Sequence, residues 1–164
     1  MNVNFINPVL KSMLNVLSTM VHIEPKVGAP KRKESNEIVQ GKNITGVMSM
    51  VGERGTASIA LTFSEAAILH IAKNMLPGEI TTIDGMVIDL VGELANMVLG
   101  GAKNDLEKGG YFFRLSLPTI ILGCDYLIAH KTNAPIIMLP FTMPEGEFVV
   151  EAGYEEAKDN KQPK

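Results

Sequence analysis

The sequence of 164 residues contains little of several residue types on which particular functions depend. Its one cysteine, Cys124, excludes an internal disulfide and fits a reducing cytoplasm. Its three histidines, His22, His70 and His130, show no spacing typical of a zinc site. Fifteen Lys and Arg against eighteen Asp and Glu give a formal net charge of -3, without the basic surplus that neutralises nucleic-acid phosphates. The sequence therefore predicts no metal site and no nucleic-acid partner.

Long apolar runs are also missing. No uninterrupted run reaches the roughly 18 to 20 residues that a membrane helix needs. The N-terminus has no basic residue before Lys11, and polar residues interrupt its apolar ones, so a cleaved secretory signal is not expected. With 46% hydrophobic residues the chain can bury one core. We expect one cytoplasmic domain over residues 1–154, no membrane span, and a polar, disordered tail over 155–164.

The hydrophobic pattern predicts an α+β fold with helices packed on a mostly antiparallel sheet. The expected helices cover residues 5–22, 64–77 and 84–100. The expected strands are 44–51, 56–63, 111–115, 118–122, 126–130, 136–141 and 147–152. The first two strands form a hairpin with one buried face, and the charged stretch 26–40 is interpreted as a solvated loop or edge strand. Glycine turns in this hairpin and in the last one hint at an internal duplication.

The third helix has one narrow polar face. At about 100° per residue, Asp89, Glu93, Asn96 and Gly100 share one side, and apolar residues occupy the opposite side. The wet side of an ordinary amphipathic helix is one interpretation. A solvated face usually carries strong helix formers, whereas Asn and Gly weaken a helix by roughly 0.7 to 1 kcal/mol relative to Ala. We therefore expect a face selected for close approach to another molecule.

The composition of this face favours docking to a protein. Glycines let a partner's backbone approach, and methionines give adaptable apolar contacts. The carboxamide of Asn96 can donate and accept hydrogen bonds at once, and Glu93 can pair with a lysine of the partner. The residues expected to bind the partner are Asp89, Met86, Gly92, Met97 and Gly100.

The pattern Asp89-x-x-x-Glu93-x-x-Asn96 lies in the run Gly92 to Val98, which is followed by Gly-Ala-Lys. This segment resembles the phosphatase motif of the CheX branch of the CheC, CheX and FliY family. The run Leu115 to Ile121 resembles the strand pair that follows the motif, and the likeness covers about residues 5–153. Two details qualify the match: Gly101 stands where relatives often have Asn, and Ile68 replaces the Asn of a second motif. The single motif fits CheX.

The resemblance implies a pseudo-two-fold CheC/CheX-like fold and a phosphatase that acts on the aspartyl phosphate of a CheY-type response regulator. In that family pattern, Asn96 orients the attacking water, Glu93 bridges to the regulator's lysine, and Asp89 supports the docked pose. Asn96 orients and does not act as a base, because its amide does not titrate usefully. The resemblance further implies that the regulator supplies the Mg²⁺, that this chain needs no cofactor of its own, and that the chain forms a homodimer through joined β-sheets.

Two other functions are considered. One is a non-catalytic module that binds a response regulator or resembles a flagellar-switch component, against which the presence of both Glu93 and Asn96 argues. The other is a self-contained hydrolase that uses Cys124 or a histidine. No histidine or cation adjoins Cys124 in sequence to lower the pKa of its thiol, and His130 is expected on a sheet surface.

Overall fold

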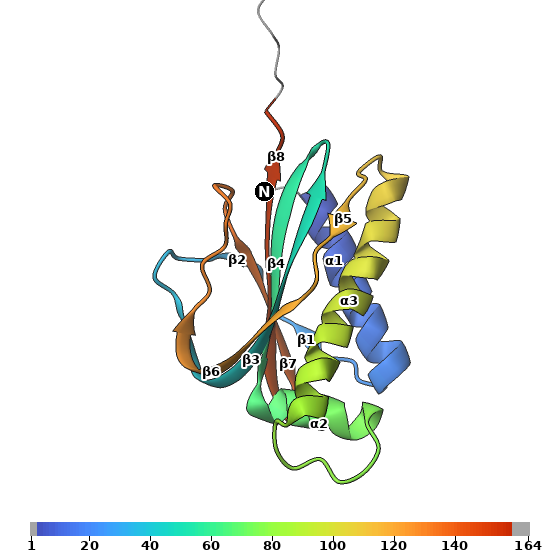
Figure 1. Cartoon of the computed structure of the whole chain (residues 1–164), viewed down its shortest axis with the longest axis vertical. Coiled ribbons are helices and arrows are strands. Elements are labelled where there is room, and N and C mark those ends of the chain that lie inside the picture. Colours follow the sequence, from blue (N-terminus) through green and yellow to red (C-terminus); the bar gives the residue numbers. More distant parts are fainter. Residues whose placement is uncertain (1–2, 159–164) are drawn as a thin grey trace, which may run out of the picture.

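The computed structural model describes residues 3–158. Its helices and strands, in chain order, are α1 (Val3–Val16), η1 (Leu17–Val21), β1 (Lys26–Val27), β2 (Lys31–Arg32), β3 (Ile38–Gly52), β4 (Gly55–Ser64), α2 (Glu65–Met75), α3 (Gly85–Lys108), β5 (Arg114–Leu115), β6 (Thr119–Leu127), β7 (Ile137–Met143) and β8 (Gly146–Glu156). Helices α1 and α3 lie on one side of a twisted sheet, and α2 lies at one end (Figure 1). The predicted α+β class is confirmed.

The sheet has the strand order β1-β7-β8-β4-β3-β5, with β2 also paired to β7 and β6 also paired to β3. Every strand pair within residues 3–158 is antiparallel. The hairpins β3–β4 and β7–β8 meet through β4 and β8, which pair along nine residues of each strand from Gly55 to Phe63. This side-by-side arrangement of two similar hairpins is the one that a pseudo-two-fold fold requires.

Strand β4 differs from its prediction, because both of its faces are buried. Ile59, Leu61 and Phe63 point into the helix-covered core as expected, but Ser58 and Thr62 on the other face are also buried. The connection between β6 and β7 covers this second face. Its residue Ile136 lies so close to Gly153, the partner of Ser58 in β8, that a Cβ at position 153 would collide with it.

A polar cluster fills the space under this cover. The Lys33 ammonium donates to Glu151 Oε2 at 2.7 Å and to the Ile128 carbonyl at 3.1 Å. His130 contacts Glu151 Oε2 through Nε2 and Ser58 Oγ through Nδ1, each at 2.8 Å. The expected edge strand in 26–40 is present as β1 and β2, and Lys31, Arg32 and Glu34 of the charge run are exposed. The prediction of a solvated charge run was wrong for Lys33, and that of a surface position was wrong for His130. Both depended on a cover that local sequence patterns do not show.

Packing between α1 and α3 explains why the third helix is longer than predicted. The first helix agrees with the prediction, and it ends where His22 adopts a left-handed conformation. Helix α3 was expected to fade at Gly100, but it continues to Lys108. A Cβ at Gly101 would collide with Ser12 Oγ of α1, so the glycine permits close contact between the helices. Lys11 of α1 also pairs with Asp105 of α3 at 2.8 Å.

The strands after α3 differ in two places from their predictions. The expected strands 118–122 and 126–130 form one strand, β6, and the expected strand 111–115 shortens to β5. The turn-like run around Asp125 is an irregularity within β6: Asp125 and Gly41 both have positive φ, and Asp125 Oδ1 accepts a hydrogen bond from the Gly41 amide at 2.8 Å.

The C-terminal strand extends beyond the predicted end of the domain at residue 154. Strand β8 includes Glu155 and Glu156, and the Glu155 carboxylate accepts hydrogen bonds from Thr132 and Asn133. These bonds lower the pKa of Glu155, the backbone N–H of Asn133 contributing most. The predicted tail thus begins later than expected, and residues 159–164 lie outside the described residues.

Helix α3 is long and apolar enough to cross a membrane by length and composition alone. Half of its most apolar window is buried inside the fold. Gly46 of β3 lies directly beneath it, since a Cβ there would stand 3.3 Å from Val91 and 3.5 Å from Ala95. These contacts are those of a helix that packs on the core of its own domain.

Candidate functional site

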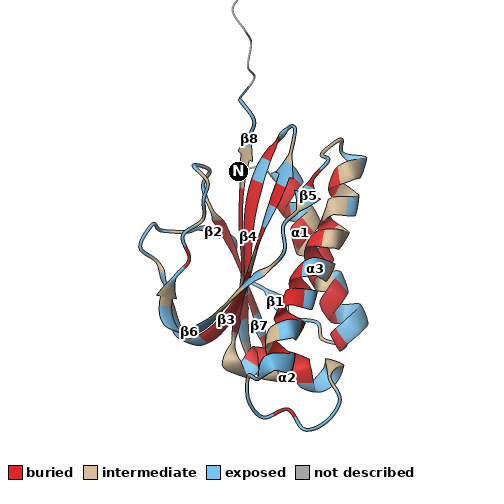
Figure 2. Cartoon of the chain, in the orientation of Figure 1, coloured by how far each residue is buried: buried red, intermediate tan, exposed pale blue. Residues whose placement is uncertain are grey.

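The polar face predicted on α3 exists and faces away from the core. Asp84 caps the helix by accepting hydrogen bonds from the amides of Met86 and Val87 at 3.0 and 3.1 Å, and this fixes where the helix begins. Asp89, Glu93 and Asn96 are all exposed. Figure 2 shows exposed and buried residues alternating along α3. The three residues form a row along α3, which we call the motif row.

The motif row is free of contacts that would hold its side chains to the protein. Within residues 3–158, none of the three makes a side-chain hydrogen bond or an ion pair. The next cation on this face, Lys103, lies 3.6 Å from Glu107 one turn further along. Two carboxylates and one carboxamide are therefore available to an outside molecule. The row holds no hydroxyl, thiol or amine, and its amide and carboxylates are suited to orienting groups of a partner.

The predicted docking residues beside the motif row differ in their exposure. Met86 is exposed, Met97 is half-buried, and a Cβ at Gly100 would meet nothing within 4 Å. Gly92 is buried, and a Cβ there would stand 3.4 Å from Cγ of Pro118. The closeness that a glycine allows at this position thus serves a contact within the chain. Gly92 therefore does not belong to the exposed face of α3.

The segment that covers Gly92 was not identified as part of the site from the sequence. It connects β5 to β6 beside α3 (Figure 1), where Pro118 lies against Gly92 of that helix. Leu117 is 88% exposed, more than any other large hydrophobic residue in the described part of the chain. The sequence signal was the Ser-Leu-Pro-Thr run itself, but its position next to α3 depends on the fold.

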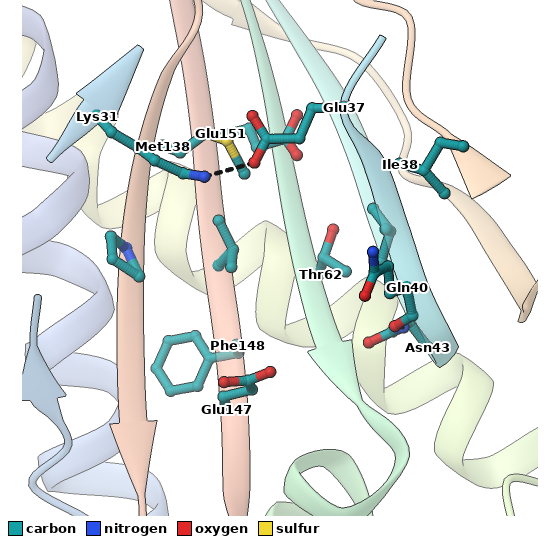
Figure 3. Close-up of a pocket in the computed structure, with 13 residues that line it drawn as sticks. Lys31, Glu37, Ile38, Gln40, Asn43, Thr62, Met138, Glu147, Phe148 and Glu151 are labelled. Carbon is teal, nitrogen blue, oxygen red and sulfur yellow. Dashed lines mark hydrogen bonds and ion pairs between the residues drawn. The ribbon is translucent and has the colours of Figure 1, made fainter. Parts of the chain in front are cut away.

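A pocket of about 270 Å³ lies on the opposite face of the sheet (Figure 3). It is lined by residues of β3, β4, β7 and β8 together with Lys31 and Glu37. The Lys31 ammonium donates to Glu37 and lowers the pKa of that carboxyl. Glu151, at the pocket wall, is bound to Lys33 and His130. Apart from the exposed Glu147, the charged groups of the pocket are thus paired within the chain, which makes the pocket a weaker candidate for a site than the motif row.

The residues of the self-contained hydrolase hypothesis do not assemble. Cys124 is exposed on β6, opposite Lys42, whose ammonium pairs with Glu65 at 2.6 Å. His22 ends η1, His70 lies in α2, and His130 belongs to the buried cluster. Among residues 3–158 no group of three or more His, Cys, Asp and Glu side chains could hold a metal ion. The structure gives the Cys124 hypothesis no support.

Comparisons with known proteins identify relatives along most of the chain. Residues 44–142 match the family model described as chemotaxis phosphatase CheX. The chain is 27% identical over 146 residues to the CheY-P phosphatase CheX of Thermotoga maritima, covering 87% of this chain and 90% of that one. A crystal structure of a CheC-like superfamily protein from Shewanella sp. PV-4 is 44% identical, covers 94% of this chain and 99% of that one, and gives a TM-score of 0.87.

A more distant structure contains a partner. It is a complex of CheX with CheY, BeF3 and Mg²⁺ from Borrelia burgdorferi, in which the matched chain is 22% identical, with a TM-score of 0.77 and coverage of 93% of this chain and 98% of that one. At this identity the similarity shows a shared fold. All of these similarities extend over α3, the helix that carries the motif row, and the family match ends within β7 at residue 142.

Proposed function

Because the chain belongs to the chemotaxis phosphatase CheX family, we propose that it hydrolyses the aspartyl phosphate of a CheY-type response regulator. The motif row is the observation that carries this proposal. Glu93 and Asn96 are exposed, make no side-chain hydrogen bond or ion pair with residues 3–158, and are mounted on a long helix that is packed from behind. Such a row can enter the active site of another folded protein. A cytoplasmic location follows from such a substrate.

The reaction needs little more than positioning. Water attacks the phosphorus in line with the bond to the aspartyl oxygen, that bond breaks, and the products are the free carboxylate and inorganic phosphate. Mg²⁺ held by the regulator would neutralise charge on the phosphoryl oxygens. Asn96 orients the water through its carboxamide oxygen, while its NH2 group can donate to a phosphoryl oxygen. The proton of the water leaves to phosphate or solvent, because an amide does not accept it.

Glu93 and Asn96 are spaced to work in one partner groove. Three residues of helix separate them by about 4.5 Å along the axis and about 60° around it. Glu93 can therefore pair with a lysine of the regulator while Asn96 reaches the phosphoryl group. Asp89, one turn before Glu93, supports the docked pose. This division gives Asn96 the effect on the chemical step and Glu93 the larger effect on binding.

The experiment measures loss of aspartyl phosphate from CheY-type regulators of the source organism, with Mg²⁺ present. We expect Asn96→Ala to lower kcat on the order of 100-fold, the effect of a misplaced reacting group, and Glu93→Ala to raise KM. Asn104→Ala is the matched control, since Asn104 is an exposed Asn of the same helix, about 12 Å further along. An Asn96→Ala protein as fast as the native chain would refute the assignment.

The alternative, a non-catalytic module that binds a response regulator, makes a different prediction in the same assay. The native chain would then bind a regulator and leave its rate of phosphate loss unchanged. The presence of both motif residues on an unobstructed face favours hydrolysis.

We further propose that two copies form a dimer by pairing their β6 strands. Strand β6 has nine residues and pairs with β3 along one edge, whereas the opposite edge of the sheet has the two-residue strands β1 and β2. Leu122 and Leu127 on β6 are exposed. A long apolar edge strand invites pairing with another chain. Light scattering after size exclusion tests the dimer.

A further inference from the structure

Leu117 is displayed to solvent by a segment that is itself fixed. The Ser116 amide donates to the Ser49 carbonyl at 2.9 Å, and Ser116 Oγ accepts from the Ser49 amide at 2.9 Å. The same hydroxyl donates to the Leu117 carbonyl at 3.0 Å. The following Pro118 restricts the backbone of Leu117 to extended conformations. The segment is therefore tied to β3 immediately before the leucine, and β6 begins immediately after Pro118.

The segment lies on the Asn96 side of the motif row. On the helix, Gly92 lies one turn before Asn96 and about 40° around the axis from it. Pro118 packs against Gly92, with Ile120 next to it. Leu117 thus stands beside the residue that would orient the water, on the margin opposite Glu93. A molecule docked on the row would meet Leu117 at its edge.

Scattered exposed leucines are common and need no explanation. Leu117 differs from them in two respects. Its carbonyl accepts one hydrogen bond, two more fix the preceding Ser116, and a proline follows, so little backbone entropy is lost when Leu117 is covered. It also extends the exposed face of the row, whose other apolar member, Met86, lies near the start of α3. Together the two residues place apolar contacts on either side of the charged and amide groups.

We propose that Leu117 is an apolar anchor for the response regulator, held beside Asn96 by Ser116 and Pro118, and inserted into an apolar patch next to the phosphorylation site. This inference rests on the proposed function for the identity of the partner. It assigns affinity to a residue outside the motif and leaves the chemical step to Asn96. Leu117 touches the partner's surface and not the reacting atoms.

The test uses the full chain and a CheY-type regulator held with BeF3 and Mg²⁺, and measures Kd by calorimetry. Leu117→Ala should weaken binding about tenfold or more, the order expected when one buried Leu side chain is lost, and Leu117→Asp should weaken it further. Leu117→Met should restore binding. Phe112→Ala is the control, since Phe112 is 68% exposed and follows the far end of α3, which lies about 18 Å along the helix axis from Asn96.

Steady-state kinetics then separate the two proposals. With an active native chain, Leu117→Ala should raise KM by the same factor and leave kcat unchanged. Unchanged Kd and KM in Leu117→Ala and Leu117→Asp, with Asn96→Ala inactive, would overturn the proposed anchor and keep the proposed phosphatase activity. Binding that depends on Leu117 without any hydrolysis would overturn the phosphatase and keep the anchor. A lower kcat at unchanged KM would also overturn the anchor.

Discussion

The buried cluster around Glu151 allows a sharp test of the fold. The side chain of Lys33 is 5% exposed and that of Glu151 is 1% exposed, and Lys33 Nζ lies 2.7 Å from Glu151 Oε2. Glu151→Gln keeps the shape of the side chain but leaves the Lys33 ammonium buried without its counter-charge. Breaking a buried pair in this way costs about 3 to 5 kcal/mol, a large part of the roughly 5 to 15 kcal/mol that stabilises a domain.

The measurement is urea unfolding followed by far-UV circular dichroism, because the chain has no tryptophan. For a domain of this size, a loss of about 3 to 5 kcal/mol in stability corresponds to a fall in Tm of roughly 6 to 20 °C. Glu156→Gln, an exposed change on the same strand, is the control and should stay within about 0.5 kcal/mol of the native chain.

A double substitution distinguishes charge from shape. Adding Lys33→Met to Glu151→Gln removes the unpaired ammonium, so the double variant should recover most of the lost stability. A cost below about 1 kcal/mol for Glu151→Gln would show that water reaches the pair. No recovery in the double variant would show that the loss comes from packing around His130. Either result would refute the view of a desolvated ion pair that fixes the cover over β4.

Three further predictions concern helix packing, acid stability and assembly. Gly101→Ala should lower the free energy of unfolding, measured in urea, by about 1 to 3 kcal/mol, because the added methyl group overpacks against Ser12. Adding Ser12→Ala should restore part of this stability. Hydrogen bonds from Lys108 and then Lys11 lower the pKa of Asp105 from 3.8 to about 2. A lowered native pKa stabilises the fold above about pH 4 and less as pH falls towards 2. Asp105→Asn should therefore lower stability at pH 7 and make no difference near pH 2; an equal loss at both would contradict the pairing. Leu122→Lys should convert dimers to monomers in light scattering, with unchanged circular dichroism; a persistent dimer would exclude the β6 edge.

Local signals predicted the helices best. The helices expected to begin at Ser64 and Asp84 do begin there, because these residues cap α2 and α3 through bonds to amides two or three residues away. The polar face of α3 followed from helical periodicity, since both its sides are decided within one element. The length of α3 did not follow: Gly101 suggests a helix end locally, and its contact with Ser12 shows only in the folded chain.

Features that depend on distant segments could not be predicted. The second buried face of β4 requires the connection that carries Ile136, more than seventy residues later. His130 and Lys33 become buried only when this cover forms around Glu151. The place of Leu117 beside the motif row likewise depends on Pro118 meeting Gly92. A single sequence holds the residues of these contacts but gives no sign of which pairs meet.

Under the proposed assignment of the motif row, its lack of intrachain hydrogen bonds within residues 3–158 separates the activity of the protein from its stability. Because the exposed side chains of Asp89, Glu93 and Asn96 make no hydrogen bond or ion pair with residues 3–158, selection for such contacts does not act on them. A lineage can lose hydrolysis by one substitution and keep an intact scaffold with its docking surfaces. Regaining hydrolysis would likewise need only one substitution. This architecture therefore allows catalysts and pure adaptors to interconvert during evolution without an unstable intermediate.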